Sequence, residues 1–214
     1  PENVQVVDKN GNTVLSQIIA TNGNKLTLLF LAKLPSAGLS VFDVRETKDK
    51  AVQSDLIAKD QTLENGYFKV MIDINGDIAS IYDKTAQREV LSQPASLQFL
   101  KENPSQWPAW NMDWKDRKNP PIDLMNKEVT VKIIERGPVR VAIEVTKKGQ
   151  NSEIGQIISL AAGEAGKRIE VCNKIDWQSK EVSLKASFPT TVSNEMATYG
   201  MNTAAIERST NNEV

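Results

Sequence analysis

The chain has 214 residues, and its 26 lysines and arginines nearly balance its 27 aspartates and glutamates, which leaves a formal net charge of −1. This balance, without a basic block, argues against nucleic acid as the main partner. The sequence has no histidine and one cysteine, which excludes the usual zinc sites, Ser-His-Asp nucleophile systems and a disulfide within the chain. No run reaches the ~18 apolar residues of a membrane span, so we expect no membrane partner.

The first part of the chain, residues 1–58, predicts a small β-domain of four strands. Asn10 and Gly11 stand between two β-rich runs, which is typical of a hairpin. Residues 25–32 are almost continuously apolar, which predicts a strand buried on both faces. Residues 47–58 are polar with weak periodicity, and they predict either a linker or an edge strand. The four strands are predicted over residues 4–7, 13–18, 25–32 and 39–44.

The second part, residues 59–214, predicts a large antiparallel β-sandwich. Short strands follow one another with turns every ~8–12 residues, which favours a sandwich over βαβ units. No window of about 11 residues shows a convincing helical period, so the predicted fold class is all-β. The predicted turns include 75–76, 83–85, 137–138, 147–149 and 163–166. The predicted strands are 68–74, 78–82, 88–91, 96–100, 129–135, 139–145, 154–160, 168–175 and 182–188.

Residues 107–121, which we call the Trp loop, form the most distinctive stretch. They hold three of the four tryptophans and are bounded by prolines, and long loops on a strand scaffold are common binding sites. An indole can lie on the C–H face of a pyranose ring, and a carboxylate can accept two hydroxyl hydrogen bonds. Alternatively, the tryptophans anchor the loop to the sandwich or to another domain. The candidate carbohydrate-binding residues are Trp107, Trp110, Asp113 and Trp114.

Other residues receive plainer interpretations. Asp113 with Asp116, or either of them with Glu102, could form the two carboxylates of a glycosidase. Charged loop residues are usually only solvated, so we predict no catalytic residue and no metal ligand in this chain. Trp177 is predicted to be a core or half-buried residue in the middle of a strand. Cys172 is predicted to be a small buried hydrophobe, since no base is available to activate it.

Several short motifs in fixed order give the sequence a family resemblance. Taken together, they resemble the C-terminal β-portion of glycoside hydrolase family 38, the α-mannosidases, over roughly residues 60–210. The motifs are Leu-Glu-Asn-Gly-Tyr at 63–67, Tyr-Asp-Lys at 82–84, Arg-Glu-Val-Leu at 88–91, Trp-Pro-Ala-Trp-Asn-Met-Asp at 107–113, Glu-Arg-Gly-Pro-Val-Arg at 135–140 and Ile-Asp-Trp at 175–177.

The resemblance implies a β-sandwich of the galactose-mutarotase-like supersandwich type. It also implies that the catalytic Asp and a zinc ion lie on an N-terminal domain absent from this chain, so we expect no cofactor here. The expected partners are that catalytic domain of the same polypeptide and mannose-containing glycans. Pro108 and Asn111 depart from the family pattern, which has Asp at both positions, whereas Asp113 matches it.

We therefore expect a non-catalytic β-region that frames the sugar cleft of a retaining glycoside hydrolase acting on α-mannosides. An autonomous carbohydrate-binding module using the Trp loop is the alternative, and a mutarotase-like sandwich of unrelated function is a third possibility. We expect the chain to be part of a longer, soluble protein of a bacterial-type cytoplasm or periplasm.

Overall fold

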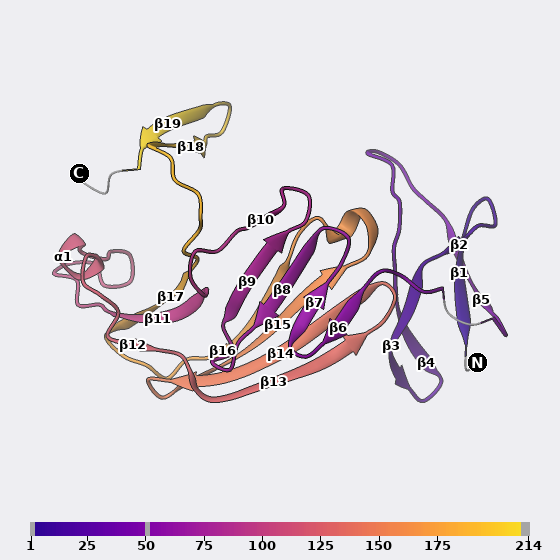
Figure 1. Ribbon diagram of the computed structural model, residues 1–214, viewed down its shortest axis with the longest axis horizontal. Coiled ribbons are helices and arrows are strands. Elements are labelled where there is room, and N and C mark those ends of the chain that lie inside the picture. The colour runs from indigo at the N-terminus through magenta and orange to yellow at the C-terminus, as the bar shows by residue number, and fades with distance from the viewer. Residues whose placement is uncertain (1–2, 50–51, 211–214) are drawn as a thin grey trace.

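The computed structural model describes residues 3–49 and 52–210 (Figure 1). The predicted domains 1–58 and 59–214 thus include residues 1–2, 50–51 and 211–214, which lie outside the described residues. Antiparallel strands in several sheets make up nearly all the regular structure, so the predicted all-β class is confirmed. Among the described residues, no helix has the length and apolarity needed to cross a membrane.

The strands of the N-terminal part are β1 Val4–Asp8, β2 Thr13–Val14, β3 Ser16–Asn22, β4 Lys25–Phe30 and β5 Phe42–Glu46. The following elements are β6 Ile57–Lys59, β7 Thr62–Glu64, β8 Phe68–Ile72, β9 Ile78–Asp83, β10 Arg88–Glu89, β11 Ser96–Lys101, α1 Trp114–Arg117, β12 Asp123–Leu124, β13 Lys127–Arg136, β14 Arg140–Gly149, β15 Ser152–Ala161, the 3-10 helix η1 Gly163–Gly166, β16 Glu170–Asp176, β17 Val182–Ser187, β18 Met196–Gly200 and β19 Ala205–Ser209.

The N-terminal strands form one small sheet, β2-β1-β5, and a separate hairpin of β3 and β4. The predicted turn between β1 and β2 is confirmed, because the Asp8 carboxylate accepts hydrogen bonds from the backbone N–H groups of Asn10 and Asn12, both at 2.9 Å. The predicted single strand 13–18 is wrong, since the chain leaves one sheet after β2 and enters the hairpin at β3.

The burial predicted for residues 25–32 is also wrong. Every side chain of β4 is exposed or half-buried, because the two-stranded hairpin has no layer on its outer face.

Two sheets pack face to face to form the main core (Figure 1). One is the five-stranded β10-β9-β8-β7-β6, and the other is the four-stranded β13-β14-β15-β16. The edge strand β6 begins within the predicted linker or edge strand. A third sheet, β12-β11-β17, carries a smaller core around Phe99 and Met125. The buried residues of the main core are Leu63, Val70, Ile72, Ile78, Ile81, Leu91, Ala95, Val141, Ile143, Val145, Ile158 and Leu160.

A buried ion pair joins these two sheets. Lys147 on β14 is only 1% exposed, and its Nζ lies 2.6 Å from Oδ1 of Asp77 and donates to the carbonyl of Gly76 at 3.0 Å. Gly76 has a φ of +69°, and a Cβ there would lie 2.5 Å from Val145. The β8–β9 turn therefore needs glycine in order to reach β14. The turn predicted at 147–149 is wrong, because β14 continues to Gly149.

A buried amide ties the β7–β8 connection to the end of β15. The side-chain nitrogen of Asn65 donates to the carbonyls of Ala161 and Gly166, both at 3.0 Å. Its oxygen accepts from the backbone N–H groups of Tyr67 at 2.9 Å and Phe68 at 2.7 Å. A buried amide with donors and acceptors both satisfied stabilises one arrangement of these loops.

A second polar contact docks the N-terminal strands on the sandwich. The side-chain oxygen of Gln17 accepts hydrogen bonds from the backbone N–H groups of Val139 at 3.2 Å and Arg140 at 3.0 Å. A Cβ on Gly137 would overlap Gln17, at 1.9 Å from its Cδ. The β13–β14 turn predicted at residues 137–138 is present. Next to it, the Arg140 guanidinium donates two hydrogen bonds to the Glu135 carboxylate, at 2.6 and 2.8 Å.

Two interpretations of single residues are corrected. Cys172 is exposed rather than buried, because β16 is an edge strand in which every residue except Val171 is exposed. Trp177 lies just after the end of β16 rather than in the middle of a strand, and it is 39% exposed. Its ring stacks on Phe99 with centroids 6.0 Å apart, so it covers the smaller core from outside.

Replacing Lys147 with Met should lower the free energy of unfolding by about 3–5 kcal/mol at neutral pH, because it leaves the Asp77 carboxylate buried without its cation. Burial raises the pKa of Asp77 above its ordinary 3.8, and Lys147 opposes that rise. Without Lys147 the pKa rises further, so the folded variant holds a proton that the unfolded chain releases above about pH 4. Stability of the variant should therefore fall as pH rises through the folded pKa.

Urea unfolding of the wild type and the variant at about pH 7 and about pH 5 measures this, with a smaller difference between the two proteins expected at the lower pH. Lys148→Met is the matched control, since Lys148 is an exposed neighbour that pairs with exposed Glu128, and it should change stability little. A Lys147→Met deficit that is the same at both pH values would contradict the assignment of the effect to Asp77.

Candidate functional site

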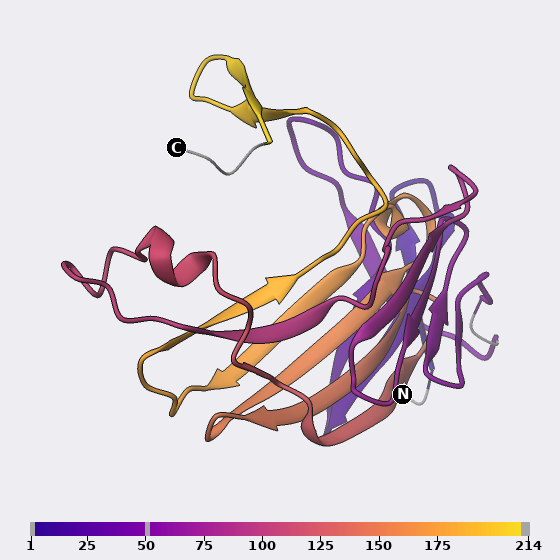
Figure 2. The ribbon, with the colours of Figure 1, turned by 60° about the vertical axis from the view of Figure 1, so that its left-hand side comes forward.

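The Trp loop connects β11 to β12 and stands away from the sandwich (Figure 2). Its residues 114–117 form the single turn of helix α1, a feature that the sequence did not predict. The backbone carbonyl of Asp113 accepts hydrogen bonds from the N–H groups of Asp116 at 3.0 Å and Arg117 at 3.1 Å, which starts this turn. Trp107 has a φ of +57°, and its carbonyl accepts from the N–H groups of Trp110 and Asn111 at 2.8 and 2.9 Å.

The Asp113 carboxylate is engaged within the loop. Its Oδ2 accepts a hydrogen bond from the backbone N–H of Ser105 at 3.0 Å, and its Oδ1 accepts from the side chain of Asn111 at 2.8 Å. Lys115 lies 3.4 Å away. The Ser105 backbone hydrogen bond is the largest cause that lowers the pKa of Asp113 below its usual value. A general acid needs a raised pKa, so Asp113 is suited to holding the loop rather than to giving up a proton.

Asp116 has a similar local contact. Its Oδ2 accepts a hydrogen bond from the backbone N–H of Asn103 at 3.2 Å, which ties α1 to the chain leaving β11. Both carboxylates of the predicted pair therefore bind backbone N–H groups at the start of the loop. This arrangement accounts for the two aspartates without a catalytic role.

The three tryptophans differ in exposure. Trp107 is 71% exposed and Trp110 is 92% exposed, whereas Trp114 is 49% exposed. The guanidinium of Arg117 lies 5.8 Å from the ring centre of Trp114, close enough for a cation–π contact. Trp107 and Trp110 are thus the two indoles with most surface available to a ligand or to another protein surface.

The structure brings only some of the candidate residues together. Trp107 and Trp110 border one shallow hollow with Asn111. Trp110 also borders a second hollow, which Arg117 and Lys185 line as well. The sequence did not identify either of these two residues as a candidate. Lys185 comes from β17, about 75 residues later in the chain, and no local pattern marks it. The other residues of the second hollow are Leu100, Asn111 and Met112.

The described residues, 3–49 and 52–210, contain no group of three His, Cys, Asp or Glu side chains that could hold a metal ion. These described residues therefore offer no set of side chains that fits zinc.

Comparison with known families decides the identity of the fold. The family model for the C-terminal domain of the glycosyl hydrolases family 38 matches residues 63–213. The chain belongs to this family. The matched segment begins in β7 and includes both sheets of the sandwich except β6, as well as the Trp loop.

Relatives and solved structures agree with this family. The chain is 27% identical to Alpha-mannosidase G of Dictyostelium discoideum, over 90% of this chain and 19% of that protein. It is 26% identical to Alpha-mannosidase 2C1 of Mus musculus, over 71% of this chain and 15% of that protein. A crystal structure of a family 38 glycosyl hydrolase from Enterococcus faecalis superposes with a TM-score of 0.69 and 16% identity, over 97% of this chain and 29% of that chain. The chain therefore spans less than a third of the length of each of these proteins.

Replacing Asp113 with Ala should loosen the Trp loop, because Ser105 and Asn111 lose their shared acceptor. Limited trypsin digestion should then cut several-fold faster after Lys115, Arg117 and Lys118, since local opening controls cleavage. Glu102→Ala is the matched control, as no side-chain hydrogen bond or ion pair joins Glu102 to another described residue. Equal cleavage rates for Asp113→Ala and the wild type would show that the carboxylate does not hold the loop.

Proposed function

We propose that this chain is a non-catalytic β-region of a family 38 α-mannosidase, and that it frames the sugar cleft of a retaining glycoside hydrolase acting on α-mannosides. The observation that carries the proposal is that two segments of the described chain project from the sandwich and have little to pack against. The Trp loop and the hairpin of β18 and β19 both extend away from the sandwich (Figure 2).

Within residues 3–49 and 52–210, strands β18 and β19 pair with each other and with no other strand. All residues of this hairpin are exposed except Ala197, which is half-buried. A two-stranded hairpin is marginally stable on its own in water, so this one needs a surface to pack against. Several large apolar side chains in and beside it are free to make that contact. They are Met196, Tyr199, Met201 and Ile206.

The Trp loop also needs a surface to pack against. Burying an indole gains on the order of 3 kcal/mol, and Trp107 and Trp110 are left largely exposed within the described part of the chain. Tryptophan is also enriched among the anchor residues of interfaces. Both projections thus present apolar side chains suited to the rest of a longer enzyme.

The catalytic domain of the same polypeptide is the partner that we propose for these projections. The chain has no histidine to bind zinc or to act as a base, and its carboxylates in the Trp loop hold backbone N–H groups. We therefore assign the nucleophile and the zinc ion to that domain. The role of this chain is to position one wall of the cleft, with mannose-containing glycans as the substrate of the whole enzyme.

An autonomous carbohydrate-binding module is the second candidate. It is favoured by the hollow between Trp107 and Trp110, which leaves both indoles accessible. In that case the loop would bind sugar in the isolated chain.

The full-length enzyme containing Trp107→Ala together with Trp110→Ala tests the framing role. We expect kcat/KM for an α-mannoside to fall about 10-fold or more, because a misplaced wall misplaces the substrate. Ile157→Ala is the matched control, since Ile157 is 37% exposed and lies on β15, away from the loop. Unchanged kcat/KM in the double variant would overturn the framing role.

The isolated 214-residue chain separates the two candidates. The framing role predicts that it hydrolyses no α-mannoside and that Trp110→Ala changes no binding of mannobiose, measured by calorimetry. Saturable binding that is lost in Trp110→Ala would instead favour the module.

A further inference from the structure

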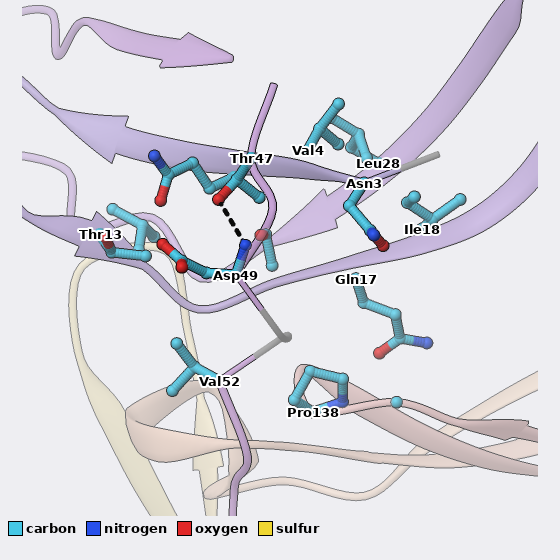
Figure 3. A pocket seen from close by; sticks show the side chains of 14 residues that line it. Asn3, Val4, Thr13, Gln17, Ile18, Leu28, Thr47, Asp49, Val52 and Pro138 are labelled. Atoms are coloured by element: carbon cyan, nitrogen blue, oxygen red, sulfur yellow. Dashed lines mark hydrogen bonds between the residues drawn. The ribbon is translucent and has the colours of Figure 1, made fainter. Parts of the chain in front are cut away.

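A cavity of about 440 Å³ lies where the N-terminal strands meet the sandwich (Figure 3). Strands β1 to β4 form one side of it, Thr47, Asp49 and Val52 line another, and the Gly137–Pro138 turn forms the end. Small-molecule sites commonly have volumes of roughly 300–1,000 Å³ and often occur between domains. The cavity therefore has both the size and the position of a ligand site.

The chemistry of the walls narrows the ligand class. The polar lining is made of amides, hydroxyls and the single carboxylate of Asp49, and no lysine or arginine is among its described residues. A carboxylate in the lining disfavours an anion. Amide side chains both donate and accept hydrogen bonds, as hydroxyl groups require of their partners. The apolar lining consists of Val4, Val14, Ile18, Leu28, Val52 and Pro138.

Several of these polar side chains have no hydrogen-bond partner among the residues that the structure describes. The side chains of Asn3 and Gln5 and the carboxylate of Asp49 form no hydrogen bond with any other residue in the described parts of the chain. The Asp49 backbone N–H, by contrast, donates to the Thr47 hydroxyl at 3.1 Å, as Figure 3 shows. Gln17 uses its oxygen for Val139 and Arg140, which leaves its NH₂ group for a ligand.

We propose that this cavity binds a neutral, polyhydroxylated small molecule, either a monosaccharide unit or a free polyol. The hydroxyl groups would bind the amides of Asn3 and Gln5 and the carboxylate of Asp49, while the apolar wall would cover the C–H surface. The site is separate from the Trp loop, which lies at the other end of the molecule (Figure 1). The proposal does not depend on the framing role.

Calorimetric titration of the 214-residue chain with methyl α-D-mannopyranoside and, separately, with xylitol tests the proposal. We expect saturable binding with a Kd on the order of 1 mM for at least one probe, as befits a ligand of about a dozen non-hydrogen atoms. Binding of the mannoside alone identifies a sugar ring as the ligand, and binding of xylitol alone identifies an open-chain polyol. Binding of both identifies the shared pattern of adjacent hydroxyls.

Two kinds of variant locate the binding. Asn3→Ala and Gln5→Ala should each weaken it about 5-fold by removing a hydrogen-bonding group, and Val52→Trp should abolish it by filling the cavity. Trp110→Ala is the control and should leave the Kd unchanged, while thermal melting verifies that each variant is folded. The proposal is overturned if neither probe binds saturably, if Val52→Trp binds as tightly as the wild type, or if only Trp110→Ala removes binding.

Discussion

The packing of the two main sheets depends on the contact between the β8–β9 turn and β14. There the Lys147 ammonium enters an otherwise apolar interface and meets Asp77 and the carbonyl of Gly76. A buried charge is tolerated only where a partner and further hydrogen bonds replace its water. This requirement fixes the position of β9 over β14, because a shift of one residue along either strand would separate the ion pair.

The motifs that carry the family resemblance fall mostly on contacts that hold loops together. Asn65 ties the β7–β8 connection to β15, and Lys84 contacts Glu64 at 2.7 Å. Glu89 accepts hydrogen bonds from Ser80 and from the backbone N–H groups of residues 81, 90 and 91. Burial alone would raise the pKa of Glu89, but these hydrogen bonds outweigh it and lower the pKa. These motifs therefore lie where side chains hold the loops of the sandwich together.

The sequence predicted those features that depend on a few neighbouring residues. The turns at Asp8 and Asp83 form because each carboxylate accepts backbone N–H groups just ahead of it. Burial depends instead on which layers lie above a strand. The apolar run of β4 and the cysteine of β16 were therefore misjudged, and Lys147 was taken for a turn residue although it is buried in β14. In the Trp loop, the sequence pointed to the exposed Trp107 and Trp110 but not to Lys185 or the internal role of Asp113.

The position of Cys172 has a practical consequence. It is the only thiol in the chain, and it is exposed on the edge strand β16. A maleimide dye would therefore attach at one known place, on the edge of the four-stranded sheet. Energy transfer from the tryptophans, three of which lie in one loop, to such a dye would then report the movement of that loop relative to the rigid sheet.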